Sequence, residues 1–152
     1  MLTIGGLNHG LVIDHIKAGG AMKIYEYLNL DSLNCQIAII KNAKSLKMGV
    51  KDIIKIDGDI DVDFDMLGVL DPNITLDFIE NGVITKKLVP QLPDIVVGII
   101  KCKNPRCITS IEQGLVHKFK LTNSIKGIYR CMYCEQAYAR SKESDSLSLK
   151  KG

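Results

Sequence analysis

The sequence predicts an α+β fold in two parts, and two observations indicate it. Short apolar runs alternate with amphipathic segments over residues 1–92, which is typical of mixed helices and strands. Residues 93–152 are instead rich in short strand-like segments and contain four of the five cysteines. Because 152 residues suffice for one ordinary domain or two small ones, we expect two domains, 1–92 and 93–152.

The first domain is predicted to hold two helices between its strands. Apolar residues at Ala21, Ile24 and Leu28 recur at the spacing of a helix face. Asp71-Pro72 ends the second helix, because proline lacks the backbone donor that a helix needs. The expected elements are, in order, a strand at 11–13, a helix at 21–30, strands at 34–40 and 52–56, a helix at 63–70, and strands at 73–80 and 83–87.

The last two of these strands form a predicted hairpin around Asn81-Gly82. Both residues readily adopt positive φ angles, which the two central positions of a type I′ turn require. If the two strands of this hairpin are counted as one β unit, the order of elements is β-α-β-β-α-β. This order is typical of ferredoxin-like domains. We therefore expect a ferredoxin-like first domain followed by a small β-rich domain.

Charge divides the chain at nearly the same place. Residues 1–94 contain nine basic and thirteen acidic side chains, whereas residues 95–152 contain eleven basic and four acidic ones. Such a split suggests two modules with different partners. Between them, Leu88 to Asp94 includes two prolines and is interpreted as a short, stiffened linker. The polar segment 139–152 is expected to be a frayed C-terminus.

The four cysteines of the second domain are spaced as two close pairs. Four residues separate Cys102 from Cys107, and two separate Cys131 from Cys134. Two such pairs joined by a loop bring four sulfurs to the corners of a tetrahedron, the geometry of structural zinc. Two disulfides or free thiols are the alternatives, but paired thiols in a reducing compartment favour one structural zinc ion and a zinc-ribbon-like domain. Cys35 stands alone in an apolar strand and is expected in the core.

No constellation typical of an enzyme occurs in the sequence. It contains neither a glycine-rich P-loop nor GxSxG, and no cysteine or serine stands beside a plausible histidine base. Four thiolates on zinc also leave no open position for a catalytic water. No apolar run approaches the roughly 20 residues of a membrane helix, and the start lacks the pattern of a secretory signal. We therefore expect a non-catalytic, cytoplasmic protein with no membrane partner.

Basic residues in the first domain suggest an anion site. Lys51 and Lys55 lie four apart in one strand, Lys87 ends the hairpin, and Asp14-His15 stands at the end of the first strand. Lysines that approach from two strands bind phosphates as mobile point charges, although solvated surface lysines are the simpler interpretation. The basic second domain offers another alternative, a small zinc-ribbon protein that binds nucleic acid. Against this, its basic residues form no single run, and it has few aromatic residues for stacking.

A series of motifs extends along nearly the whole chain. They are Val12-Ile13-Asp14-His15-Ile16, the segment from Met48 to Ile56, Asn81-Gly82, Leu92-Pro93, and the segments from Cys102 to Cys107 and from Cys131 to Glu135. Each is moderately specific alone, but in this order and spacing they resemble the regulatory chain of aspartate carbamoyltransferase. The resemblance implies a non-catalytic allosteric subunit of pyrimidine biosynthesis, with no nucleic acid as partner. Its zinc domain would dock on the catalytic chain, and regulatory dimers would bridge two catalytic trimers.

The resemblance also implies nucleotide effectors, with CTP and UTP as inhibitors and ATP as activator. Asp14 would contact the ribose with Lys51 as a neighbour, and Lys55 would contact the ribose or the α-phosphate. Lys87 and His15 would hold the triphosphate. The base pocket would be formed by Leu7, Val12, Ile79 and Ile84, with backbone groups near Gly82 at the base edge.

Two positions depart from the family pattern. Asp77 stands where the family usually has asparagine, and Gly5 where it often has an acidic residue. An ionised carboxylate accepts hydrogen bonds but cannot donate them, so Asp77 would also add negative charge near the nucleotide.

Overall fold

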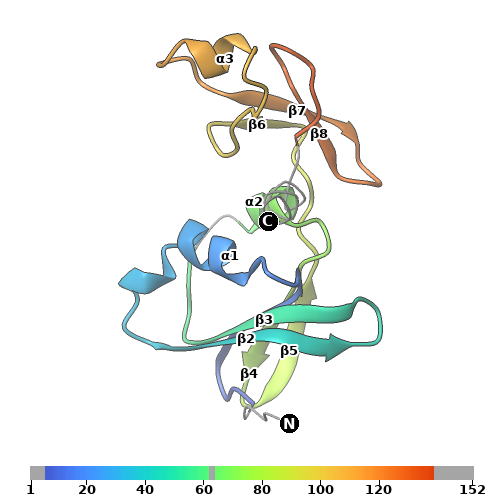
Figure 1. The fold of residues 1–152 in the computed structure, drawn as a ribbon. Coiled ribbons are helices and arrows are strands. Elements are labelled where there is room, and N and C mark those ends of the chain that lie inside the picture. Colours follow the sequence, from blue (N-terminus) through green and yellow to red (C-terminus); the bar gives the residue numbers. More distant parts are fainter. Residues whose placement is uncertain (1–5, 62–63, 139–152) are drawn as a thin grey trace, which may run out of the picture. The chain divides into compact units, whose positions relative to one another are not determined.

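The computed structural model describes residues 6–61 and 64–138. The chain divides into two compact units, Met1–Gln91 and Leu92–Gly152, which are described separately (Figure 1). Gly5 and the expected C-terminal tail at 139–152 lie outside the described residues. The α+β prediction is confirmed, since the first unit is a mixed sheet-and-helix domain and the second is a small strand-rich domain that carries the clustered cysteines.

The first unit is built around a five-stranded antiparallel sheet with the strand order β2-β3-β1-β4-β5. β1 lies between β3 and β4, as the split βαβ arrangement requires, and β5 extends the edge beyond β4. Its elements are β1 (Gly10–Lys17), α1 (Ala21–Tyr27), the 3₁₀ helix η1 (Leu30–Ser32), β2 (Gln36–Ser45), β3 (Gly49–Asp57), α2 (Asp65–Leu70), β4 (Thr75–Glu80) and β5 (Val83–Leu88). The predicted ferredoxin-like order is therefore confirmed.

Several element boundaries differ from the prediction. β1 continues to Lys17, so Asp14 and His15 lie inside the strand and not at its end. The first helix ends three residues earlier than expected, because Asn29 adopts a left-handed conformation (φ 54°) and the chain continues as η1. The predicted hairpin turn is confirmed, with positive φ angles at both Asn81 and Gly82.

Helices α1 and α2 cover one face of this sheet, and the core lies between them and the strands (Figure 1). Side chains alternate along a strand, so every second residue faces that core. On β1 and β3 these are Leu11, Ile13, Ile54 and Ile56, all buried. The residues between them, including Val12 and Lys55, point to the opposite face, which neither α1 nor α2 covers, and this is called the open face below.

A β-bulge in β1 places two consecutive side chains on the open face. Ile13 pairs with Ile54 and Ile16 with Asp52, so Asp14 and His15 together stand opposite one residue of β3. Ile13 and Ile16 both remain in the core, and His15 takes a positive φ of 58°. The irregularity thus keeps the apolar side chains buried while it presents two polar ones side by side.

The second unit is a three-stranded antiparallel sheet with the order β6-β7-β8. Its elements are β6 (Ile95–Val97), the short helix α3 (Ile108–Ile111), β7 (Lys118–Asn123) and β8 (Ile128–Cys131). Its small core is formed by Val96, Ile100, Phe119 and Tyr129, and the Tyr129 hydroxyl donates a hydrogen bond to the carbonyl of Pro93 at 2.6 Å. So few buried side chains leave much of the folding free energy to be supplied by something other than apolar burial.

Candidate metal centre and ligand-binding face

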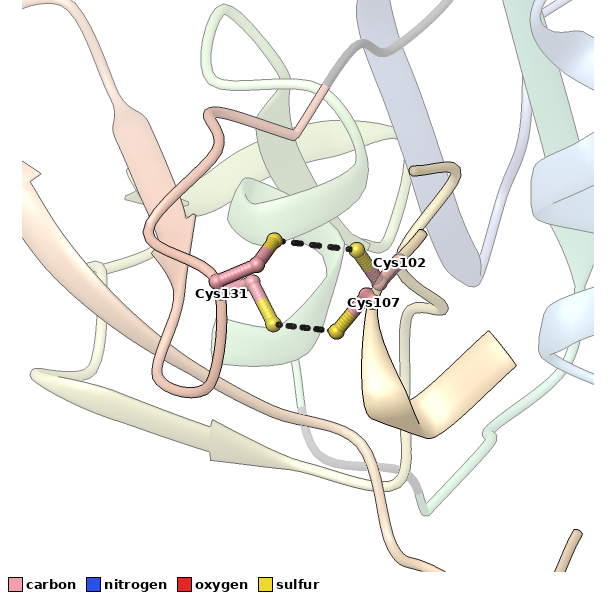
Figure 2. A group of neighbouring side chains, drawn as sticks. Cys102, Cys107 and Cys131 are labelled. Atoms are coloured by element: carbon pink, nitrogen blue, oxygen red, sulfur yellow. Dashed lines mark hydrogen bonds between the residues drawn. The ribbon is translucent and has the colours of Figure 1, made fainter. Parts of the chain in front are cut away.

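Four thiols converge in the second unit. Their sulfur atoms, from Cys102, Cys107, Cys131 and Cys134, all lie within 4.8 Å of one another. The Cys102–Cys134 and Cys107–Cys131 sulfur pairs are each 3.7 Å apart. Figure 2 shows Cys102, Cys107 and Cys131 with their side chains pointing toward one another.

These distances fit a metal ion and exclude disulfides in this geometry. A disulfide holds its sulfurs about 2.05 Å apart. A tetrahedral zinc ion with Zn–S bonds of about 2.3 Å requires neighbouring sulfurs at about 3.8 Å, close to the two separations seen here. The predicted four-cysteine centre for one metal ion is confirmed, and its donor set is consistent with zinc.

Local backbone structure positions each pair of thiols. Cys107 is the N-cap of α3, and its sulfur lies 3.0 Å from the hydroxyl of Thr109. Cys131 ends β8, and the N–H of Tyr133 donates to its sulfur at 3.4 Å. Such N–H and O–H groups stabilise negative sulfur and orient it toward the metal.

The environment shifts the thiol pKa values in opposite directions. Burial raises the pKa of Cys102 to about 12, whereas the hydrogen bond with Thr109 lowers the pKa of Cys107 to about 7. Burial also raises the pKa of Cys131. A metal dication must displace protons from such thiols, so metal affinity rises with pH, and the bound ion favours all four thiolates.

On the open face of the first unit, four predicted ligand residues lie in one row. Val12 pairs with Lys55 of β3 on one side and with Asp77 of β4 on the other, and Asp77 pairs with Lys87 of β5. All four have the same orientation because registered partners in a sheet point to the same face. The Lys87 ammonium lies 3.8 Å from the Asp77 carboxylate.

The β1 bulge adds a second cluster to this face. Lys51 and Asp14 form an ion pair at 2.9 Å, and both side chains are largely buried. His15 Nδ1 lies 2.9 Å from the Thr75 hydroxyl, within hydrogen-bonding distance. The predicted residues Asp14, Lys51 and His15 are therefore close together, although their roles toward a ligand stay predictions.

The β4–β5 hairpin pairs two of the predicted base-pocket residues. Ile79 and Ile84 are registered partners, and Leu7 precedes β1 in the same unit. The N–H of Gly82 donates to the carbonyl of Asn8 at 2.9 Å, which ties the segment before β1 to the hairpin turn. This bond already uses the Gly82 N–H, so a base edge would be read by neighbouring backbone groups.

His9 also joins this segment to the sheet, and its pKa is raised. Its Nε2 lies 2.9 Å from Asp59 and its Nδ1 3.4 Å from Glu80. The hydrogen bond with Asp59 is the main cause of the raised pKa. Because the folded-state pKa exceeds the unfolded value, this group stabilises the fold below about pH 6.5, and the stabilisation is lost as pH rises through the folded pKa.

We expect an NMR titration of the His9 ring to give a pKa above the reference value of 6.5. Asp59→Asn should lower it, because the carboxylate that favours the imidazolium is removed. Asp31→Asn, which changes an exposed carboxylate that contacts Tyr25, serves as the control. A pKa at or below 6.5 in the unmodified chain would contradict the ion pairs described above.

Sequence reasoning missed three residues that support these sites. Thr109 contacts the Cys107 sulfur, and His117 accepts the N–H of Cys102 through Nδ1 at 3.0 Å. Asp52 is fully buried on the core face of β3, the side opposite the open face. Of the three, only Asp52 could have been found from the sequence. It lies two residues before Ile54 and four before Ile56, so strand alternation places all three side chains on the core face.

The fold and the four-thiolate centre define a class of protein, one in which a ferredoxin-like domain is joined to a small domain built around a structural metal ion. Comparison with family models gives two matches. Residues 2–91 match the allosteric domain of the aspartate carbamoyltransferase regulatory chain, and residues 94–143 match its metal-binding domain. The chain therefore belongs to the family of aspartate carbamoyltransferase regulatory chains.

Individual relatives agree with this membership. The regulatory chain of Clostridium acetobutylicum is 51% identical over 142 residues, which cover 93% of this chain and 97% of the relative. That of Clostridium botulinum is 48% identical over 139 residues, covering 91% and 95%. That of Bifidobacterium longum is 42% identical over 135 residues, covering 89% and 97%.

Membership assigns the chain a regulatory role. Its domains are those of an allosteric and metal-binding subunit, not of a catalytic one, and the catalytic chain of aspartate carbamoyltransferase is its implied partner. The nucleic-acid alternative is not favoured by these matches. Within residues 6–61 and 64–138, no helix has the length and apolar character to cross a membrane.

Proposed function

We propose that residues 1–92 form an allosteric domain that binds a nucleotide on the open face of its sheet. Support comes from the row of Lys55, Val12, Asp77 and Lys87, which crosses four strands. Neighbouring strands lie about 4.8 Å apart, so the two lysines are separated by roughly 14 Å at their Cα atoms. Lysine side chains are long and flexible, so ammonium groups from both ends of this row can reach toward the phosphates of one nucleotide.

Each side chain on this face has a role that its chemistry supports. Asp14 accepts hydrogen bonds from ribose hydroxyls, and Lys51 holds its carboxylate in place. Lys55 lies toward the ribose and the α-phosphate, while Lys87 and His15 hold the terminal phosphates. The base packs against the aliphatic side chains Leu7, Val12, Ile79 and Ile84.

We further propose CTP and UTP as inhibitors and ATP as activator. A nucleotide on this chain acts on an active site in another chain, so its effect requires unequal affinity for two quaternary states. Couplings of this kind typically amount to about 1–3 kcal/mol. Inhibitor and activator then compete for one site and stabilise opposite states.

Residues 93–152 form, in this proposal, the domain that docks on the catalytic chain. Exposed aliphatic side chains follow the metal ligand Cys107 closely, namely Ile108, Ile111, Leu115 and Val116. Exposed apolar groups concentrated in this way mark interaction surfaces. Metal binding folds this surface, and regulatory dimers bridge catalytic trimers in the cytoplasm, so the holoenzyme is a hetero-oligomer.

Lys87→Ala is expected to weaken CTP and ATP binding by about tenfold or more, because a charge-assisted contact with phosphate is lost and the Asp77 carboxylate is left without the ammonium that offsets its charge. The measurement is calorimetric titration of the zinc-loaded chain with each nucleotide. Saturable binding by the unmodified chain, weakened in the variant, supports the nucleotide site.

Lys86→Ala provides a matched control on the same strand. Lys86 lies over the ring of Phe78, 5.5 Å from its centroid, on the opposite side of β5 from Lys87. Its loss removes the same charge without touching the open face, so nucleotide affinity should change little. Failure of the unmodified chain to bind either CTP or ATP would refute the proposed site.

A further inference from the structure

Asp77 and Lys87 form an ion pair whose two side chains differ in solvent exposure. The Asp77 side chain is 14% exposed and lies between Val12 and Lys87 in the register of the sheet. The Lys87 side chain is 72% exposed, and its ammonium lies 3.8 Å from the carboxylate. The lysine is therefore mostly exposed to solvent, whereas the carboxylate is largely buried on the face proposed to receive the nucleotide.

The second pair on this face behaves differently. Asp14 and Lys51 are 19% and 16% exposed and lie 2.9 Å apart, so they form a fixed, mutually neutralised unit. Two lysines on the open face, Lys51 and Lys87, thus have an aspartate within 4 Å. Each of these two ammonium charges is therefore offset by a carboxylate, which leaves less positive charge for a ligand with several phosphate charges.

A phosphate that approaches Lys87 meets opposing effects. The phosphate can form an ion pair with the Lys87 ammonium only if the ammonium moves away from Asp77. The Asp77 carboxylate then remains nearby and repels the phosphate. Like charges a few ångströms apart on a partly buried face interact appreciably, since solvent screens them less than it does at an open surface. Each additional phosphate charge increases this repulsion, whereas the base and ribose are unaffected by it.

We propose that Asp77 is a specificity-determining residue that reduces the contribution of the terminal phosphates to nucleotide affinity. This inference rests on the proposed function of the open face. The site of this chain then distinguishes nucleotides chiefly by base and ribose, and only weakly by the number of phosphates.

The test compares CMP, CDP and CTP as ligands of the full zinc-loaded chain, by calorimetry at fixed ionic strength without divalent cations. In the unmodified chain, affinity should rise less than about tenfold from CMP to CTP. Asp77→Asn keeps the side-chain shape and removes the charge. It should increase the CTP-to-CMP affinity ratio by about tenfold, mainly through tighter CTP binding, and added salt should reduce the difference.

Glu26→Gln is the matched control, because it removes one carboxylate from α1, which covers the opposite face of the sheet. Its affinity ratio should equal that of the unmodified chain. Thermal unfolding of Asp77→Asn should be nearly unchanged, which separates an electrostatic role from a structural one.

The possible outcomes separate this inference from the proposed function. Equal CTP-to-CMP ratios in Asp77→Asn and the unmodified chain, with both binding CTP, would overturn the role of Asp77 and leave the nucleotide site intact. Absence of binding in both proteins would overturn the site and the inference together. Binding of CTP by Asp77→Asn alone would overturn nucleotide binding as a function of the unmodified chain, while it would support the inference that the Asp77 charge opposes CTP.

Discussion

Cys107→Ala is expected to unfold the second unit and leave the first unit folded. The remaining three thiols cannot complete a tetrahedral site, and the small core around Phe119 and Tyr129 is insufficient by itself. Removal of the metal by a chelator should produce the same state. Because the proposed docking surface follows Cys107 directly, the variant should also fail to assemble with the catalytic chain.

The measurement combines metal content, amide NMR and sedimentation with the catalytic chain. Signals from residues 95–138 should lose their dispersion while those from residues 10–88 keep theirs, and CTP binding should persist. Cys35→Ala is the control, since Cys35 lies in the first unit, outside the thiol cluster, and its replacement should preserve the bound metal. A stable mixed complex formed by Cys107→Ala would disprove a folding role for the centre.

Asp52→Ala is expected to lower the free energy of unfolding of the first unit by about 3 kcal/mol, or roughly 15 °C in Tm. The buried carboxylate accepts three backbone N–H groups from two segments, those of Gly19 and Ala21 at the β1–α1 junction and that of Asn42 in β2, at 3.0–3.2 Å. Alanine leaves these donors without an acceptor in the place where α1 begins and β2 bulges. The free energy lost with these three hydrogen bonds exceeds the free energy gained when the carboxylate is no longer buried.

Thermal and urea unfolding of the two variants Asp52→Ala and Asp57→Ala provide the comparison. Asp57 ends the same strand, β3, but is exposed, so its replacement should change stability by less than about 0.5 kcal/mol. Equal effects of the two substitutions would show that the three hydrogen bonds contribute little.

The metal ligands could be predicted from sequence because their geometry is mostly local. A Cys-x-x-Cys turn and a four-residue loop each bring two sulfurs together whatever the rest of the chain does, and only one long-range contact is then needed. The Asn81-Gly82 turn is similar, since positive φ angles depend on residue type. The end of the first helix was predicted less well, because the left-handed Asn29 reflects the path of the following chain.

The candidate nucleotide site was predictable as a set of residues but not as an arrangement. Sequence spacing places Lys51 and Lys55 on one face of a strand, yet it contains no information on which strands become neighbours. Sheet order and register, set by burial of the core against α1 and α2, put Asp77 between Val12 and Lys87. The bulge at Asp14 and His15 likewise arises because Ile13 and Ile16 must both face the core.

The two-part α+β fold, the cluster of four thiols and the family of the chain could all be inferred from the order of its amino acids. These features depend on local spacing and on patterns that extend in order along the chain. The tertiary structure, in contrast, pairs Lys51 with Asp14 and Lys87 with Asp77, and it lets Asp52 tie β3 to the β1–α1 junction and to β2. Such pairs join residues from different strands, and the pairing of strands is a property of the whole core.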